Sequence, residues 1–104
     1  MVKELHPRRG DVHLIALDPT RGAEMQKTRP CLIVSPDELN AHLKTVIVAP
    51  LTSVTRLYPF RVPCQFEGTR GQVVLDQLRT VDRERLLRRL GKLSAPTVEK
   101  VLGL

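Results

Sequence analysis

Short apolar runs rich in β-branched residues recur along this chain, and a turn signal closes each one. Runs of this length and even spacing are typical of strands rather than buried helices. The core must rest on Val, Ile and Leu, because the sequence holds one Tyr, two Phe and no Trp. We therefore expect a mainly β fold, a small closed barrel, with strands at Val12–Leu17, Cys31–Val34, Thr45–Pro50, Phe60–Phe66, Gln72–Leu75 and Leu78–Val81.

Two helix-start signals interrupt the strand pattern. Ser35–Glu38 combines a capping serine, a proline at the first helical position and a glutamate that completes a capping box, and it predicts a short helix reaching about His42. Ser94–Pro96 predicts a C-terminal helix. Its apolar face is expected to hold Val98, Val101 and Leu102.

Three further segments carry local signals. Pro63 marks its strand as an edge strand or a bulge, because proline cannot donate to a ladder. The polar pair Asp76-Gln77 interrupts an apolar segment and indicates a bulge that aims side chains into a site. The run Leu86–Leu93 is ambiguous, and Cys31 is expected to be a buried small hydrophobe.

The charge balance points to a polyanionic partner. The 104 residues carry 17 Lys and Arg against 11 Asp and Glu, a net charge of +6, which attracts polyanions such as nucleic acid. A solvated face that keeps the protein soluble explains this charge equally well. Because aromatic residues are few, phosphate contacts rather than base stacking should supply the main grip. The basic residues gather at Arg79, Arg83, Arg85, Arg88, Arg89 and Lys92.

The length of the chain and the motifs it lacks limit the number of domains and the cellular location that we expect. A chain of 104 residues has room for one compact domain, and dimerisation would add apolar contact. No segment approaches the roughly 20 apolar residues that a membrane span requires, and no signal peptide is visible. Two cysteines without a CxxC spacing make neither a metal knuckle nor a redox motif. We expect a cytoplasmic protein that does not associate with membranes.

The sequence lacks the common catalytic motifs but places polar groups at two strand ends. The histidines are scattered, so we expect no metal site, and no phosphate-binding glycine loop or GxSxG elbow is present. Arg29 precedes one apolar run, and Thr52 and Ser53 follow another. If those strands pair, a guanidinium beside hydroxyls would make a phosphate site. Spacing alone favours a simpler alternative, in which Arg29 is a surface cation and Thr52 begins a turn.

An ordered set of segments resembles the MazF/PemK family of toxin–antitoxin ribonucleases, from Arg9 to the final helix. The segments are Arg9-Gly10-Asp11-Val12, Leu17-Asp18-Pro19-Thr20-x-Gly22-x-Glu24, Arg29-Pro30, Pro50-Leu51-Thr52-Ser53, Tyr58-Pro59-Phe60 and Gly71-x-Val73-Val74-Leu75-Asp76-Gln77-Leu78-Arg79-Thr80-Val81-Asp82. The resemblance implies one toxin domain over residues 1–104, with an SH3-like barrel that forms a homodimer. It also implies a cognate antitoxin with an acidic C-terminal segment.

The implied activity is sequence-specific, metal-independent cleavage of single-stranded RNA, without a cofactor. The 2′-OH attacks to give a 2′,3′-cyclic phosphate (or 3′-phosphate) and a 5′-OH, and loss of mRNA inhibits translation and growth. Arg29 and Thr52 match the central catalytic pair, and Glu24 matches a supporting acidic position. The RNA-binding positions carried over are Lys27, Thr28, Ser53, Asp76, Gln77 and Arg79.

The sequence departs from the family pattern at two auxiliary positions. Ala23 stands where some members have His, and Val74 stands where some have Arg, so those roles are not carried over. The C-terminal helix is also shorter than is usual in the family.

In the implied mechanism, Thr52 positions the 2′-OH or a phosphate oxygen, while Arg29 stabilises the charge that develops on the phosphorane. Glu24 acts as base only if its loop brings it close. The Asp18–Arg29 loop is predicted to be mobile without RNA and to help select bases. Two alternatives are a non-catalytic nucleic-acid-binding barrel and a gyrase-directed toxin of the same fold.

Overall fold

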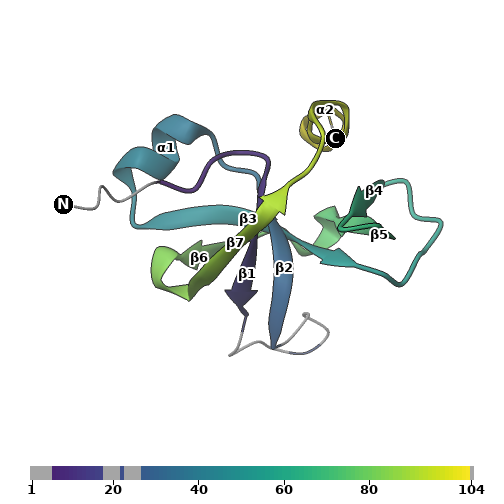
Figure 1. The fold of residues 1–104 in the computed structure, drawn as a ribbon, viewed down its shortest axis with the longest axis horizontal. Coiled ribbons are helices and arrows are strands. Elements are labelled where there is room, and N and C mark those ends of the chain that lie inside the picture. Colours follow the sequence, from purple (N-terminus) through teal and green to yellow (C-terminus); the bar gives the residue numbers. More distant parts are fainter. Residues whose placement is uncertain (1–5, 18–21, 23–26, 104) are drawn as a thin grey trace.

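The computed structural model describes residues 6–17, 22 and 27–103, and it shows a strongly curled β-sheet with two α-helices (Figure 1). The predicted mainly β architecture, with a short internal helix and a C-terminal helix, is confirmed. In chain order the elements are β1 (Asp11–Ala16), β2 (Thr28–Ile33), α1 (Asp37–His42), β3 (Thr45–Thr52), β4 (Arg61–Phe66), β5 (Thr69–Val74), η1 (Leu75–Gln77), β6 (Arg79–Asp82), η2 (Arg83–Arg85), β7 (Leu86–Lys92) and α2 (Ala95–Leu102).

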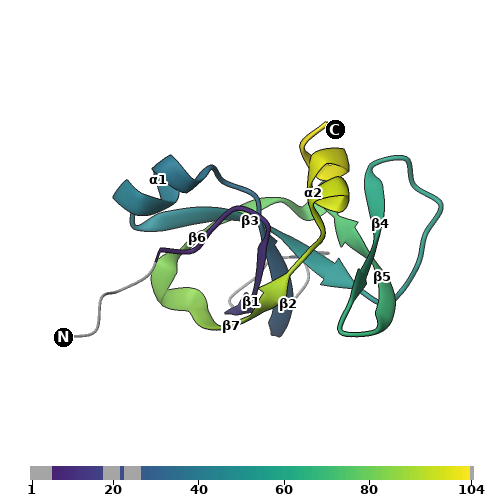
Figure 2. The same cartoon turned by 45° about the horizontal axis from the view of Figure 1, so that its top comes forward.

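Strand β3 holds the sheet together, because it pairs with three neighbours. Its first half pairs with β6, its end pairs with β5, and β2 lies along its other side. Pro50, which has no N–H to donate, lies in β3 between the residues that pair with β6 and those that pair with β5. Among the described residues the strand path begins at β4 and ends at β7, so the sheet is a curled half-barrel rather than a closed one (Figure 2).

The core consists of two aliphatic clusters. Neighbouring residues of β2 belong to different clusters, because successive side chains of a strand point to opposite faces. Cys31 is fully buried, as predicted. One cluster, beneath α2 and the β4–β5 hairpin, holds Val12, Leu32, Ala49, Leu51, Val62, Val73, Leu93 and Val101. The other holds Ile15, Leu17, Cys31, Ile33, Val46, Val48 and Val81.

The predicted capping box of α1 is wrong. Pro36 occupies the N-cap position, and no side chain caps the helix. The Ser35 hydroxyl donates instead to the Asn40 side-chain oxygen and accepts from the backbone N–H of Ile47 at 3.1 Å. Asn40 is fully buried and its polar atoms need partners. Ser35 therefore ties α1 to β3 rather than capping the helix.

The start of α2 follows its sequence signal. The Ser94 side chain accepts from the backbone N–H of Thr97, and Val101 is buried against the core. Leu102, however, is 44% exposed, so only the Val98 and Val101 part of the expected apolar face packs against the core. Neither helix of the described residues is long and apolar enough to cross a membrane.

Several element boundaries differ from expectation, because neighbouring strands extend the ladders. Thr28 and Arg29 begin β2, and Leu51 and Thr52 end β3, although both pairs were expected in loops. Asp76-Gln77 forms part of η1 rather than a bulge. The ambiguous run is strand β7. Pro63 lies on β4, an edge strand of the described sheet, as one of its two alternatives predicted.

Candidate active site

The pairing of β2 with β3 brings Arg29 and Thr52 to the same end of the sheet. Cys31 lies opposite Pro50 in this antiparallel ladder. Continuing the register by two residues places Arg29 level with Thr52. Both residues, together with Ser53, line one cavity of about 290 Å³. The condition set from the sequence, that these strands pair, is therefore met.

The Thr52 hydroxyl is held at the edge of this cavity by its local backbone. Its oxygen accepts a hydrogen bond from the backbone N–H of Val54 at 3.1 Å. A hydroxyl has one hydrogen and two acceptor lone pairs, so this bond fixes the oxygen and leaves the hydrogen available to a ligand. Thr52 is half-buried, and it lies opposite Gln72 of β5.

Gly71 permits the close approach of β5 to the end of β3. A Cβ atom built at Gly71 would overlap the Thr52 carbonyl oxygen. Only a residue without a side chain fits beside the Thr52 backbone at this point. Gly71 itself lines the cavity, so it helps to set the position of Thr52.

The β4–β5 hairpin forms the other side of the cavity. Phe66 pairs with Thr69 across a two-residue turn, in which Glu67 and Gly68 have φ of 51° and 76°. Positive φ at both central residues is the type I′ pattern that suits a hairpin. The hairpin contributes to the cavity Cys64, Phe66, Glu67, Thr69, Arg70 and Gly71.

Arg70 and Glu67 were not found from the sequence. The pairing of β5 with β3, which brings this hairpin to Arg29, is a long-range contact without a local signal. With these residues, the cavity combines two guanidinium groups, two hydroxyls of the Thr52-Ser53 pair and one carboxylate. Guanidinium and hydroxyl donors that converge on one space can bind a phosphate group.

The cysteine near this site is protonated at neutral pH. Burial raises the pKa of the Cys31 thiol to about 12, and the positive charges of Arg79 and Arg29 oppose that rise only in part. Burial also raises the pKa of Cys64, which lines the cavity. Because the thiolate is the nucleophilic form, neither cysteine is suited to covalent catalysis.

Two further predicted residues meet at the end of β1. The backbone N–H of Leu17 donates to the Lys27 carbonyl at 2.8 Å, and the Arg79 side chain donates to the Leu17 carbonyl at 3.2 Å. Lys27 has a φ of 64°, which is unusual for a residue with a side chain. Thr28 follows as an exposed residue at the start of β2. These residues adjoin the strand that carries Arg29 but do not line the cavity.

Asp76 and Gln77 lie apart from the cavity, on η1 at the far end of β5. Asp76 forms a two-pronged ion pair with Arg61, at 3.2 and 3.3 Å. Glu24 lies outside the described residues. So does most of the loop predicted to be mobile, at residues 18–21 and 23–26.

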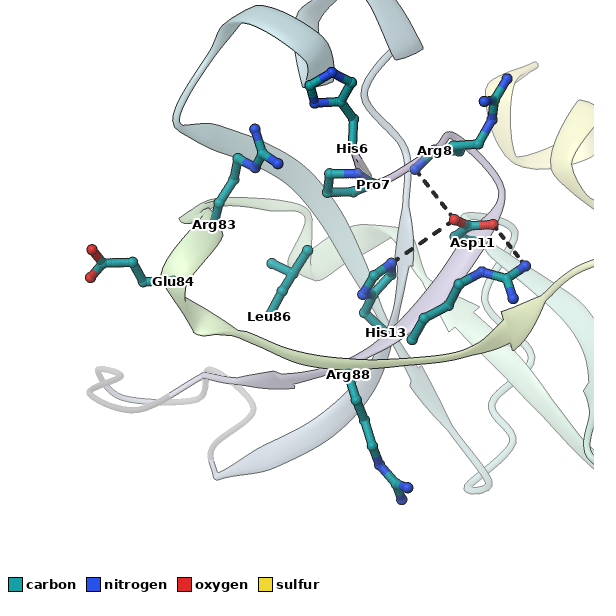
Figure 3. Close-up of a pocket in the computed structure, with 10 residues that line it drawn as sticks. His6, Pro7, Arg8, Asp11, His13, Arg83, Glu84, Leu86 and Arg88 are labelled. Atoms are coloured by element: carbon teal, nitrogen blue, oxygen red, sulfur yellow. Dashed lines mark hydrogen bonds and ion pairs between the residues drawn. The ribbon is translucent and has the colours of Figure 1, made fainter. Parts of the chain in front are cut away.

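A larger cavity of about 960 Å³ lies between the N-terminal segment, β1 and the start of β7 (Figure 3). Asp11 lines this cavity, and its carboxylate accepts from the Arg89 guanidinium at 3.2 Å and from the backbone N–H of Arg8 at 3.3 Å. The Nε2 atom of His13 lies 4.0 Å from the same carboxylate. Burial lowers the pKa of His13, Asp11 raises it and Arg89 lowers it further.

The smaller cavity is the better candidate for chemistry. The Asp11 carboxylate is already paired with the Arg89 guanidinium and the Arg8 backbone N–H, and Figure 3 shows Arg88 pointing away from Asp11 and His13. The smaller cavity instead gathers Arg29, Thr52 and Ser53 from separate parts of the chain. Within the described residues, no group of three His, Cys, Asp or Glu side chains is placed to hold a metal ion.

Known proteins match this sequence over nearly the whole chain. Residues 8–103 match the family described as PemK-like, MazF-like toxin of type II toxin–antitoxin system. Endoribonuclease MazF9 of Mycobacterium tuberculosis is 38% identical, over 85% of this chain and 83% of the relative. Endoribonuclease PemK of Escherichia coli is 40% identical, over 91% of this chain and 76% of the relative.

Solved structures agree with the fold. A crystal structure of MazF from Deinococcus radiodurans superposes with a TM-score of 0.85 at 29% identity, covering 96% of this chain and 93% of that one. A mycobacterial endoribonuclease in complex with its cognate antitoxin superposes with a TM-score of 0.78 at 28% identity, covering 92% and 87%.

Proposed function

Since the chain belongs to the PemK-like, MazF-like family of type II toxin–antitoxin toxins, whose curated relatives are named endoribonucleases, we propose that it cuts single-stranded mRNA at specific short sequences. Cleavage proceeds without a metal ion, and loss of mRNA inhibits translation and growth. The observation that carries this proposal is the convergence of Arg29, Thr52 and Ser53 on one cavity.

The proposed reaction uses the nucleophile that RNA already carries. The 2′-hydroxyl loses its proton to a base and its oxygen bonds to phosphorus, while the bond from phosphorus to the 5′-oxygen breaks. The products are a 2′,3′-cyclic phosphate and a 5′-hydroxyl, once the leaving oxygen has taken a proton. Thr52 orients the 2′-hydroxyl or a phosphate oxygen through its hydroxyl hydrogen.

Arg29 stabilises the charge that grows on the phosphorane oxygens. A guanidinium offers paired donors to phosphate oxygens and keeps its proton at neutral pH. A fixed cation in a partly enclosed site stabilises this charge more than bulk water does. The base is one of two glutamates. Glu24 is the position that the family resemblance suggests, and Glu67 is the carboxylate that lines the described cavity.

We also propose two protein partners. One is a second copy of the chain, since a domain of 104 residues buries a limited core by itself. The other is a cognate antitoxin whose acidic C-terminal segment competes with RNA for the basic surface. The mycobacterial neighbour in complex with its antitoxin supports this class of partner.

The test is to incubate the purified protein with a long single-stranded RNA in EDTA and to map the cut ends. We expect cuts at one short sequence, with cyclic phosphate and 5′-hydroxyl termini. Arg29→Ala and Thr52→Ala should each slow cutting by about 100-fold or more. Lys100→Ala, which removes an exposed cation on α2 that lines neither cavity, serves as the control.

The contrary outcomes are distinct. Intact RNA, or cutting that requires added metal, contradicts the proposed reaction. RNA that binds but stays intact would indicate a non-catalytic binding protein, and direct binding to gyrase without RNA cleavage would indicate a gyrase-directed toxin. If the reaction is as proposed, binding should also weaken steeply with salt, because phosphate contacts release counterions.

A further inference from the structure

Two of the three aromatic side chains in this sequence stack on each other at the surface. The rings of Tyr58 and Phe60 lie 5.2 Å apart between centroids and 15° from parallel. Tyr58 is 45% exposed and Phe60 is 42% exposed. Aromatic side chains usually contribute to a core or an interface, so an exposed stacked pair in a chain with one Tyr and two Phe indicates a binding role.

The aromatic pair is held in place by a tight turn and a cation. The backbone N–H of Arg61 donates to the Tyr58 carbonyl at 3.2 Å, which closes a turn around Pro59. The Arg61 guanidinium lies 5.0 Å from the centre of the Tyr58 ring, within the range of a cation–π interaction. Asp76 grips the same guanidinium with both oxygens, at 3.2 and 3.3 Å. The arrangement is therefore preorganised.

The aromatic pair and the candidate active site belong to one connected unit. Residues 53–57 link the cavity to Tyr58, and Gln72 holds this link. The Gln72 side chain accepts from the backbone N–H of Arg56 at 3.0 Å and donates to the Arg56 carbonyl at 2.8 Å. Gln72 is also the strand partner of Thr52. Figure 2 shows β4 beside β5, with the loop from β3 leading into β4.

The separation suits a short stretch of RNA. Five residues lie between Thr52 and Tyr58, so the six steps from one to the other span at most about 20 Å. Stacked nucleotides advance by about 3.4 Å each, and extended ones by more. An RNA strand bound with its scissile phosphate in the cavity can therefore place a flanking base at the aromatic pair.

We propose that Tyr58, Phe60 and Arg61 form a stacking subsite for one nucleobase of single-stranded RNA that flanks the cleaved phosphate. The inference rests on the proposed function. Every base has a π-face, so stacking on an aromatic ring adds affinity with little sequence preference. Arg56 is exposed on the loop that leads to the aromatic pair, and its positive charge favours a nucleic acid over an apolar protein segment.

Asp76 acts in this subsite as a positioning residue. It holds the Arg61 guanidinium over the Tyr58 ring, while Tyr58 and Phe60 both stay exposed. Asp76 lies on η1, away from the cavity, and this role fits that position. Asp76→Asn should therefore weaken RNA binding without changing the single-turnover rate at saturating protein.

The experiment uses an RNA that contains the mapped cleavage sequence, with a 2′-deoxy sugar at the cut position so that it binds without reacting. 2-Aminopurine is placed at each flanking position in turn, because its fluorescence is quenched by stacking. We expect one position to be quenched by the native protein. Tyr58→Leu combined with Phe60→Leu should remove the quench and weaken binding by about 10-fold. Tyr58→Phe, which keeps the ring, should preserve both.

Two further measurements separate stacking from a purely structural role. An RNA truncated before the quenched position should bind the native protein and the double variant equally. An abasic residue at the quenched position should weaken binding to the unaltered protein by about 10-fold. This second test holds even if the double variant does not fold.

Each contrary outcome is separable from the proposed function. A native protein that neither binds nor cuts RNA contradicts the proposed function itself. Cutting with full affinity for every abasic RNA overturns the stacking subsite alone. A double variant that becomes monomeric while its RNA affinity is unchanged also overturns it, and assigns the aromatic pair to the contact between two copies of the chain.

Discussion

The two cavities of this protein gather charged groups in different ways. Around Asp11, an almost buried carboxylate meets the Arg89 guanidinium, the Arg8 backbone and the edge of His13. The Asp11–Arg89 ion pair joins β1 to β7, while the buried Nε2 atom of His13 has no hydrogen-bond partner among the described residues. In the cavity lined by Arg29 and Thr52, donors from separate strands face a common space instead.

The difference shows how charge serves stability in one place and ligand binding in another. A buried carboxylate needs partners, and losing one leaves it unsatisfied. The Asp11 cluster is thus expected to support the fold. Converging donors with a single carboxylate, Glu67, gain most when an anion enters. Volume does not separate these two roles, because the Asp11 cavity is the larger one.

The largest expected effect tests the comparison with the same substitution in both cavities. Arg29→Lys keeps the positive charge but loses the planar pair of donors, so we expect the single-turnover rate of RNA cleavage to fall about 100-fold. Arg89→Lys, made beside Asp11, should leave that rate unchanged and lower the thermal midpoint slightly, since Arg89 is half-exposed. Equal losses of rate in both variants would erase the distinction between the two cavities.

A smaller effect is expected from Gly71→Ala. The added Cβ meets the Thr52 carbonyl, so β3 and β5 must separate, at a cost of about 1–3 kcal/mol in the free energy of unfolding. Displacing Thr52 should also slow cleavage roughly 10-fold. Urea unfolding and single-turnover cleavage measure the two effects.

Gly103→Ala provides the control for Gly71→Ala, because a Cβ at Gly103 meets only ordinary contacts and its φ is −79°. It should change neither stability nor rate appreciably. If Gly71→Ala behaves like this control, Gly71 does not position Thr52.

The cavity of Arg29 and Thr52 shows which parts of a site can be predicted from sequence. Arg29 and Thr52 could be expected together, because each adjoins an apolar run and adjacent runs often pair. Their place inside strands was missed, since ladders extend where a neighbour supplies hydrogen bonds. Arg70 and Glu67 were missed because the pairing of β5 with β3 has no local signal.

Another miss comes from burial. Ser35 has the ideal type for a helix cap, but the buried side chain of Asn40 and the Ile47 N–H take its hydroxyl instead. The scarcity of aromatic residues indicated that phosphate contacts rather than base stacking supply the main grip on RNA, and this stays a prediction. Composition gives the number of aromatic residues but not their placement, and the structure puts Tyr58 and Phe60 at the surface.

A third prediction tests whether the Asp11 cavity serves the fold and not the chemistry. Asp11→Asn removes the charge that pairs with Arg89, and it should lower the free energy of unfolding by about 1 kcal/mol, because solvent screens the half-exposed guanidinium. The cleavage rate per folded molecule should stay unchanged. A lower rate at full folding would mean that the Asp11 cavity contributes to the chemistry.

The smallest effect concerns pH and belongs to His13. Burial lowers its pKa in the folded protein below the ordinary value of 6.5, with Asp11 opposing and Arg89 reinforcing that shift. The unfolded chain therefore binds the proton more readily than the folded one. The stabilisation from a neutral His13 is present above about pH 6.5 and is lost as pH falls from there through the folded pKa.

Urea unfolding at pH 7.5 and pH 5 measures this loss, which for one proton cannot exceed about 1.4 kcal/mol per pH unit. His13→Gln keeps a polar side chain that does not titrate here, so its stability should fall less over the same interval. His42→Gln, at an exposed position of α1, is the matched control and should retain the native pH dependence. Identical pH profiles for His13→Gln and the native protein would show that the histidine beside Asp11 takes up its proton without cost. The Asp11 cavity would then be more open to solvent than its packing indicates. In that respect it would resemble the cavity of Arg29.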